Sequence, residues 1–281
     1  MAEKVYVVTG GNAGIGYEIV QALAQQQGRV VLVSRDEARG RAAQRAIHAA
    51  TGGSVDLVVG DVGSVASTRR LADQLLAAYP AIHVLINNAG VWMTKKVVNE
   101  DGLEQSFMVN HLAPFMLNHL LLPALKAADP ARIVDVNAGL YVNGKVDLAK
   151  TPYGKDFGRL RTYANSKLCG VLTLAEQARR LEGSGVTINM VHPGVIRTGL
   201  GDSNGVMGWL LRRIKRNWAA PDAGAVAPVW LATAPEVAGK TGLYFNEKAE
   251  MPLAAVAQDE ALAADLWALS VRLAGLETRL K

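Results

Sequence analysis

The feature that most constrains the fold of this chain is a glycine-rich turn directly after its first strand-like run. A strand-like Val5-Tyr6-Val7-Val8 leads into Thr9-Gly10-Gly11-Asn12-Ala13-Gly14-Ile15-Gly16, and a helical pattern follows. Glycine permits a tight turn and a close approach of the backbone to a ligand, and the free N–H groups of a helix N-terminus attract an anion. This order predicts a β-α-β unit that binds a dinucleotide pyrophosphate.

The same alternation of strand and helix continues along the chain. Seven strands are expected, at Val5–Thr9, Val30–Ser34, Val55–Val59, Val84–Asn87, Arg132–Val136, Thr187–His192 and Leu243–Phe245. Helical patterns lie near 15–27, 36–50, 64–78, 104–127, 160–182, 222–234 and 258–274. Several strands are apolar throughout, as in parallel strands covered on both faces. We therefore expect an α/β fold, a single doubly wound (Rossmann) domain over residues 1–281, with a mostly parallel seven-stranded sheet and helices on both faces.

Composition excludes several classes of protein. Half of the 281 residues are hydrophobic, which provides a large core, yet no apolar run approaches the roughly 18 residues of a membrane span. The single cysteine, Cys169, excludes an internal disulfide and is expected to be a buried small side chain. The absence of a recognisable secretion signal adds to this, and a cytoplasmic location is expected. No metal site is expected either, and structural roles are expected for the scattered histidines, which are His48, His83, His111, His119 and His192.

Two long segments interrupt the alternation, at 139–159 and 199–220. Ligands of open α/β sheets bind outside the carboxyl ends of the strands, so we expect both segments to face a substrate. The second holds Trp209 and Trp218 beside the cations Arg212, Arg213, Lys215 and Arg216. We interpret it as a substrate lid, while peripheral contact with an anionic membrane is the alternative. The net charge of +5 permits nucleic-acid binding, but no nucleic-acid-binding motif is present and none is expected.

The motifs together resemble those of the short-chain dehydrogenase/reductase superfamily, and of its retinol dehydrogenase-like branch. Thr9-Gly10 to Gly16 matches the cofactor turn, and the other matches follow in the superfamily's order along essentially the whole chain. They are Asp61-Val62, Asn87-Asn88-Ala89-Gly90, Asn110, Tyr163-Ala164-Asn165-Ser166-Lys167, His192-Pro193-Gly194 to Thr198, Gly242 to Phe245 and Trp267.

The resemblance implies a nicotinamide cofactor. The residues that would hold it are Gly10, Asn12, Gly14, Ile15, Gly16, Ser34, Arg35, Asp61, Val62, Asn88, Ala89, Gly90, Tyr163, Lys167, Pro193, Gly194, Ile196 and Thr198. The second strand ends in Ser34-Arg35-Asp36, which places an arginine where an NAD-binding protein carries an acid. We therefore expect NADP(H) in preference to NAD(H). Arg39 and Arg41 could add to the positive field, although a solvated helix face is the simpler expectation for both.

Tyr163 and Lys167 are four residues apart, so both project from one face of a helix. A phenol has a pKa near 10, and an adjacent ammonium favours its ionised form. In the superfamily the tyrosine is the general acid/base toward the substrate oxygen, and the lysine also holds the nicotinamide ribose. The corresponding asparagine, here Asn110, supports a water-linked proton relay. The resemblance implies the same roles here.

The chain departs from the superfamily at the catalytic serine. Alignment through Arg132–Val136 places Asn137-Ala138 where relatives carry Ser-Ser, so that the serine position falls on Ala138. Removal of one such hydrogen-bond donor commonly costs on the order of 10² to 10³ in rate. Three interpretations stay open, namely a substitute donor such as Asn137, Tyr141 or Asn143, slow or substrate-assisted turnover, and loss of ordinary redox function.

The interpretation as a whole is an NADP(H)-dependent oxidoreductase acting on a carbonyl or alcohol of a bulky hydrophobic substrate. Residues expected in the substrate pocket are Trp92, Met93, Ala138, Tyr141 and Trp209. One alternative is an enzyme of the same fold that performs cyclisation, dehydration or isomerisation. Another is a non-catalytic NADP(H)-binding protein. By analogy with relatives, a homo-oligomer would form through the helices that begin near 104 and 160.

Overall fold

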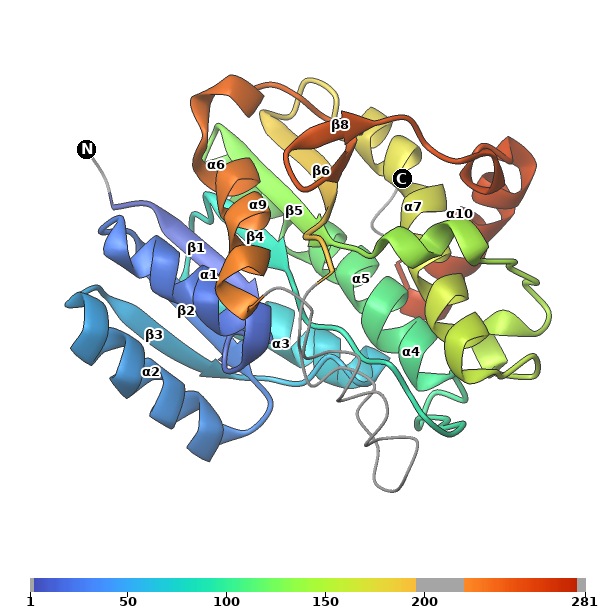
Figure 1. Cartoon of the computed structure of the whole chain (residues 1–281), viewed down its shortest axis with the longest axis horizontal. Coiled ribbons are helices and arrows are strands. Elements are labelled where there is room, and N and C mark those ends of the chain that lie inside the picture. The colour runs from blue at the N-terminus through green and yellow to red at the C-terminus, as the bar shows by residue number, and fades with distance from the viewer. Residues whose placement is uncertain (1–2, 196–219, 277–281) are drawn as a thin grey trace.

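One eight-stranded sheet lies at the centre of the protein (Figure 1). The computed structural model describes residues 3–195 and 220–276. The strand order is β3-β2-β1-β4-β5-β6-β7-β8, and all neighbouring pairs are parallel except the last. The strands are β1 Val5–Thr9, β2 Arg29–Ser34, β3 Val55–Val59, β4 Val84–Asn87, β5 Ala131–Val136, β6 Val186–His192, β7 Tyr244–Asn246 and β8 Ala249–Met251. The order reverses between β1 and β4, and this switch point opens a crevice at the carboxyl ends of the strands.

The expected number of seven strands was wrong by one. β8 pairs antiparallel with β7, with Asn246 opposite Ala249, and all three of its residues are exposed. A strand of three exposed residues is too short for an alternating pattern to be recognised, so the sequence could not predict it. The other seven strands lie within two residues of their expected positions.

Helices cover both faces of the sheet. On one face lie α1 Gly14–Gln25, α2 Glu37–Thr51 and α9 Pro221–Thr233, and on the other lie α3 Val65–Ala78, α4 Gln105–Phe107, α5 Ala113–Leu120, α6 Leu122–Ala127, α7 Arg159–Arg180 and α10 Glu260–Ala274. Successive strand side chains point to opposite faces. In β1, Val7 belongs to the core under α3 and α5, whereas Val8 packs under α1 and α2. Among the described residues no helix is long and apolar enough to cross a membrane.

The helix expected at 104–127 is interrupted at Asn110. Residues Met108–Leu112 form a π-helical turn in which the Ala113 N–H bonds to the Met108 carbonyl. Pro114 causes this interruption, because it has no N–H to donate to the Asn110 carbonyl four residues earlier. The chain thus places a locally irregular backbone at the residue that the sequence assigns to a proton relay.

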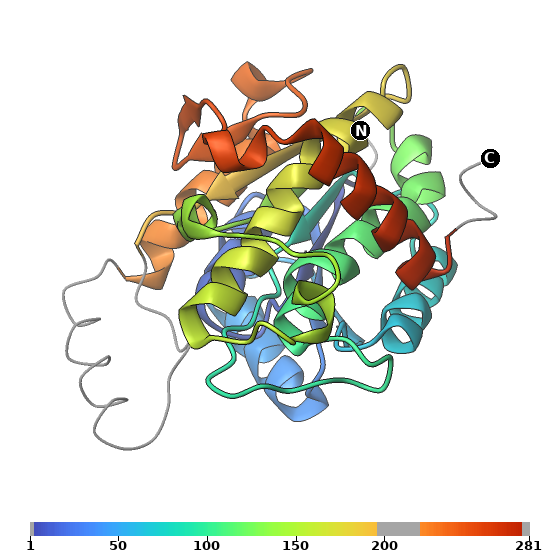
Figure 2. The same cartoon turned by 90° about the vertical axis from the view of Figure 1, so that its right-hand side faces the viewer.

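The C-terminal helix α10 covers the outer faces of α5 and α7 (Figure 2). Ser270 Oγ lies 2.9 Å from His111 Nε2, and the Trp267 ring lies 4.9 Å from the Phe115 ring. The Arg180 guanidinium stacks on Trp267 at 4.7 Å. This packing argues against the expected dimer contact through the helices near 104 and 160, because the chain covers that surface itself.

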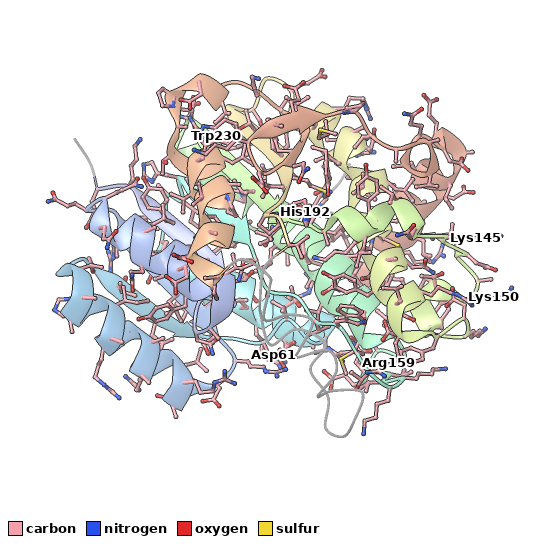
Figure 3. All side chains as sticks on the ribbon, in the orientation of Figure 1. Asp61, Lys145, Lys150, Arg159, His192 and Trp230 are labelled. Atoms are coloured by element: carbon pink, nitrogen blue, oxygen red, sulfur yellow. The ribbon has the colours of Figure 1, made fainter. Side chains whose placement is uncertain are left out.

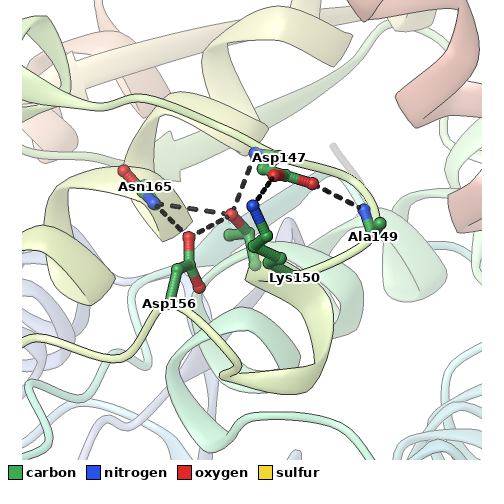
Figure 4. Close-up of polar contacts among 6 residues, drawn as sticks. Asp147, Ala149, Lys150, Asp156 and Asn165 are labelled. Carbon is green, nitrogen blue, oxygen red and sulfur yellow. Dashed lines mark hydrogen bonds and ion pairs between the residues drawn. The ribbon is translucent and has the colours of Figure 1, made fainter.

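The polar segment after β5 is tied to α7 (Figure 4). Thr151 Oγ1 donates to Asp156 Oδ2 at 2.8 Å, and the Asn165 amide donates to the same carboxylate oxygen at 3.2 Å. The Lys150 ammonium pairs with Asp147 at 2.9 Å. Lys145 and Lys150 lie at the edge of the molecule, far from His192 in the view of Figure 3. The expectation that all of 139–159 faces the substrate was therefore wrong for this part of it.

Candidate active site

A cleft of about 780 Å³ opens at the carboxyl ends of the parallel strands. It runs from the end of β2 across the glycine turn to the ends of β5 and β6. Its lining residues are Thr9, Gly10, Asn12 to Gly16, Val33, Arg35, Asp36, Arg39, Gly60 to Val62, Asn88 to Trp92, Val109, Val136 to Leu140, Tyr163, Lys167 and His192 to Val195. One cavity thus joins most of the predicted cofactor residues to Tyr163 and Lys167.

The glycine turn provides a backbone cradle for a pyrophosphate. Gly10 and Gly14 have φ of +67° and +56°, a left-handed conformation that favours glycine. A Cβ on Gly16 would overlap the Gly10 carbonyl and the Asn88 amide. α1 begins after Ala13 with no side-chain cap and no acidic residue in its first turn. Its N–H groups and dipole are therefore open to an anion, and the cradle fits a dinucleotide.

Hydrogen bonds between β1 and β4 fix the floor of the cradle. Thr9 Oγ1 accepts from the backbone N–H groups of Asn88 and Ala89, each at 3.0 Å. The Asn88 amide donates to the Thr9 carbonyl at 2.9 Å. Asn88 is thus a positioning residue that holds the Asn88–Gly90 segment against the turn.

The end of β2 presents positive charge to the cleft. Asp36 caps α2, with its carboxylate accepting from the Arg39 N–H at 3.0 Å. Ser34 is buried and donates to the Asp36 carbonyl at 2.9 Å, so it holds the turn and does not line the cleft. Arg41 pairs with Glu37, whereas Arg35 and Arg39 line the cleft. Arg39 is exposed, as expected for a solvated helix face, and it also lines the cleft.

Asp61 and Val62 line the cleft directly after β3. The Asp61 carboxylate accepts from the Gly63 N–H at 3.0 Å, which fixes its place in this loop. Both residues belong to the expected cofactor set.

Tyr163 lies on α7 with its ring stacked on Trp92, at 5.0 Å between centroids and 20° between planes. The Trp92 indole N–H donates to the Arg159 carbonyl at 2.8 Å, which fixes the ring over the first turn of α7. The Lys167 ammonium lies 5.9 Å from the Tyr163 centroid. Burial raises the pKa of Tyr163 to about 12, so the phenol is protonated at neutral pH.

Lys167 is buried and donates to the Val136 carbonyl at 3.0 Å. Burial lowers the pKa of Lys167 to about 8, and the charge of Asp135 opposes this. The Asp135 carboxyl is itself buried, which raises its pKa to about 6, and it accepts from the Asn87 amide at 2.7 Å. A buried acid thus supports the ammonium from beneath the cleft.

Asn110 braces the cleft wall from the π-helical turn. Its amide donates to the Val91 carbonyl and to Ser166 Oγ, each at 2.9 Å, and its oxygen accepts from the Val91 N–H at 2.8 Å. The side chain is therefore fully used by hydrogen bonds within the protein. Asn110 joins α7 to the Trp92 segment.

Two expected substitutes for the missing serine point elsewhere. The Asn137 amide donates to the Lys167 carbonyl at 3.2 Å, and its oxygen accepts from the Ala138 N–H at 2.6 Å. Tyr141 is buried away from the cleft, with its hydroxyl accepting from the Ala254 N–H at 3.1 Å. Both expectations were wrong because these groups already bond within the protein. Asn143 is exposed and does not line the cleft, whereas Ala138 does line it.

His192 was missed by sequence reasoning. It was assigned a structural role because it lacks metal-ligand spacing, yet its side chain lines the cleft at the end of β6, near the centre of Figure 3. Its Nδ1 is buried and has no hydrogen-bond partner among the described residues. Its place directly before Pro193-Gly194, the segment expected along the nicotinamide, was the signal available in the sequence.

The remaining predicted residues lie in the cleft, away from it, or outside the described part of the chain. Pro193 and Gly194 line the cleft, whereas Met93 does not, so its expected pocket role was wrong. Ile196, Thr198, Trp209 and the expected lid lie outside the described residues, except Ala220. Cys169 is fully buried as expected. Within residues 3–195 and 220–276, no cluster of His, Cys, Asp or Glu could hold a metal ion.

Known proteins are similar to this chain in sequence and in fold. The short chain dehydrogenase family model matches residues 4–206. Retinol dehydrogenase 13 of Homo sapiens is 37% identical, covering 98% of this chain and 85% of that protein. Retinol dehydrogenase 14 of Mus musculus is also 37% identical, covering 98% and 87%. An uncharacterized protein from Mycobacterium paratuberculosis has a similar structure, with a TM-score of 0.78, 27% identity and coverage of 98% and 94%. The chain therefore belongs to the short-chain dehydrogenase/reductase superfamily, in its retinol dehydrogenase-like branch.

Proposed function

We propose that this protein is an NADP(H)-dependent oxidoreductase that interconverts a carbonyl and an alcohol on a bulky hydrophobic substrate. The observation that carries the proposal is the shared cleft, in which Tyr163 and Lys167 lie beside the backbone cradle for a dinucleotide. A phenol and an ammonium at this place serve proton transfer to an oxygen next to the nicotinamide.

The charge at the far end of the cleft supports NADP(H) over NAD(H). Arg35 and Arg39 line this end together with Asp36, which uses one of its carboxylate oxygens to cap α2. A 2′-phosphate is favoured by guanidinium groups, whereas the 2′-hydroxyl of NAD calls for a free carboxylate.

The side chains of the cleft perform the proton half of the reaction. A reduced nicotinamide cofactor held by the glycine turn would supply the hydride for the carbonyl carbon. Tyr163 donates its proton to the oxygen, which completes the alcohol, and then regains a proton from solvent. Its pKa of about 12 keeps this proton in place at neutral pH and favours carbonyl reduction. The Lys167 ammonium stabilises the phenolate that the transfer leaves behind.

Apolar groups around Tyr163 support a hydrophobic substrate. Val91, Trp92, Ala138, Leu140 and Val195 line this end of the cleft, and Val195 is 58% exposed at its rim. The retinol dehydrogenases named above are similar to the chain over almost its full length. This similarity supports a substrate of the same class, an apolar alcohol or aldehyde.

Single-turnover mixing tests the proposal. Purified protein and NADPH are mixed with a panel of hydrophobic aldehydes, ketones and quinones, and absorbance at the reduced nicotinamide band is followed while products are weighed by mass spectrometry. We expect NADPH oxidation matched by a product two hydrogens heavier than its substrate. A product of unchanged mass, or one lacking water, would instead establish the non-redox alternative. Tight NADPH binding without any turnover would establish a binding protein.

A further inference from the structure

We propose that His192 donates the hydrogen bond to the reacting oxygen that a hydroxyl at position 138 would otherwise supply. This inference rests on the proposed redox function and adds a catalytic residue to it. The position in question lies at the end of β5, where Ala138 lines the cleft with a methyl group only. Without a second hydrogen-bond donor, only the tyrosine hydroxyl stabilises the negative charge that develops on the substrate oxygen.

The sheet register places His192 beside this position. Val136 of β5 pairs with Val191 of β6, and the Asn137 N–H bonds to the Val191 carbonyl at 2.8 Å. His192 therefore stands next to Asn137, one residue before Ala138. Its side chain shares the cleft with Tyr163 and Lys167.

The imidazole ring packs directly against the backbone that follows Ala138. A Cβ on Gly139 would lie 3.2 Å from His192 Cδ2 and 3.4 Å from Nε2. Glycine at 139 thus leaves room for the ring, and the Cδ2–Nε2 edge faces Gly139, the residue directly after the serine position. The nitrogen at this edge is Nε2, which is the donor that the proposal requires.

The opposite nitrogen lies in the interior. His192 and Tyr244 project to the same face of the sheet, because Met190 pairs with Tyr244 and His192 lies two residues beyond Met190. His192 Nδ1 and Tyr244 Oη are both buried, and neither has a hydrogen-bond partner among the described residues. Nδ1 thus lies in the interior, and Nε2, at the Gly139 edge, is the ring nitrogen that is left to face the cleft.

The charge state of the ring suits a neutral donor. Burial lowers the pKa of His192, and the Lys167 ammonium lowers it further, while Glu247 opposes both. A neutral imidazole carries one N–H and donates a hydrogen bond without giving up its proton. Tyr163 stays the only proton donor in the reaction, and His192 supplies the second hydrogen bond.

The other polar side chains at the ends of β5 and β6 cannot donate this second hydrogen bond to the reacting oxygen. The Asn137 amide is committed to the Lys167 carbonyl, and residue 138 has no polar atom. The Nδ1 of His192 has no hydrogen-bond partner within the described part of the chain, and the ring lines the cleft. His192 is thus the side chain at this edge that has a donor to offer.

Two amide replacements separate the two nitrogens of the ring. In His192→Gln the amide reaches the position of Nε2, and in His192→Asn it reaches only that of Nδ1. With a substrate that the wild type turns over, we expect His192→Gln to keep most of its kcat and His192→Asn to lose about 10² to 10³-fold. NADPH affinity, measured by fluorescence, is expected to stay unchanged in both and reports that the cleft is folded. His48→Asn, on the exposed side of α2, is the matched control and is expected to leave kcat unchanged.

Restoring the hydroxyl provides the decisive arm. We expect Ala138→Ser to raise kcat of His192→Asn by at least about 10-fold and to raise that of the wild type much less, because two donors then compete for one oxygen. Equal gains in both backgrounds would overturn the proposal, and so would a His192→Asn variant that binds NADPH and keeps wild-type kcat. A wild type without any turnover would instead count against the proposed function itself.

Discussion

The two ends of the cleft are built in different ways. At the nucleotide end the contacts come from backbone, namely the glycine turn, the N-terminus of α1 and the strand ends held by Thr9 and Asn88. At the chemical end they come from side chains on separate elements, namely Trp92 after β4, Tyr163 on α7 and His192 on β6. The backbone contacts at the nucleotide end depend on a few glycines. At the chemical end, a single side chain can be replaced while the fold is kept.

This difference fits the place where we expect the chain to depart from its superfamily. The resemblance matches the glycine turn to the superfamily's motif and places Ala138 at the serine position, and in the structure an indole stacks on the phenol of Tyr163. Substitutions at the chemical end should therefore alter turnover and leave cofactor affinity alone, and substitutions at the nucleotide end should do the reverse.

The largest effect is expected for Tyr163→Phe. The ring and its stacking on Trp92 survive, but the proton donor is lost, so kcat should fall by about 10² to 10⁴-fold while the NADPH dissociation constant stays within about two-fold. Single-turnover kinetics and cofactor fluorescence measure the two quantities. Tyr153→Phe, outside the cleft, is the matched control. A parallel loss of cofactor affinity would break the separation of the two ends.

The next largest effect is expected for Gly16→Ala, at the opposite end. The added Cβ overlaps the Gly10 carbonyl, so the cradle must open and NADPH affinity should fall by about 10²-fold. Titration by calorimetry checks this. Gly183→Ala is the control, because it strains a left-handed residue with nothing within 4 Å of the new carbon, and it should cost stability without affinity. Unchanged affinity in Gly16→Ala would show that the turn does not hold the cofactor.

The same contrast decides what the sequence could predict. The parallel sheet, the glycine turn and the helical spacing of Tyr163 and Lys167 follow from local patterns, so they were predictable. β8 has no such pattern, and α10 covers a surface that only tertiary packing defines. The directions of the Asn137 and His192 side chains depend on neighbours far apart in the sequence, which is why one was chosen wrongly and the other overlooked.

Arg35→Ala should sharpen the comparison within the nucleotide end. Loss of a charge-assisted hydrogen bond to a phosphate costs about 1.5–3 kcal/mol, which corresponds to roughly 10- to 100-fold weaker NADPH binding. NADH lacks that phosphate, so its affinity should hardly change. Arg45→Ala, exposed on α2 and outside the cleft, is the control. Equal losses for both cofactors would remove the argument for NADP(H).

The smallest effect is expected for a change at Asp135, beneath Lys167. Burial lowers the pKa of Lys167 to about 8, and the negative charge of Asp135 keeps this pKa from falling further. Carbonyl reduction that uses the ammonium should therefore fall as pH rises through about 8. Asp135→Asn removes the supporting charge while keeping the shape, so the pKa of Lys167 drops further and the falling limb moves to lower pH. At pH 7 kcat should change by less than about ten-fold, because one pKa unit is a factor of ten in protonation.

Rate profiles from pH 6 to 9.5 measure the shift, with the exposed Asp73→Asn as control. An unmoved limb would mean that Lys167 holds its proton without help from the buried acid, and that the chemical end depends only on the side chains that line the cleft.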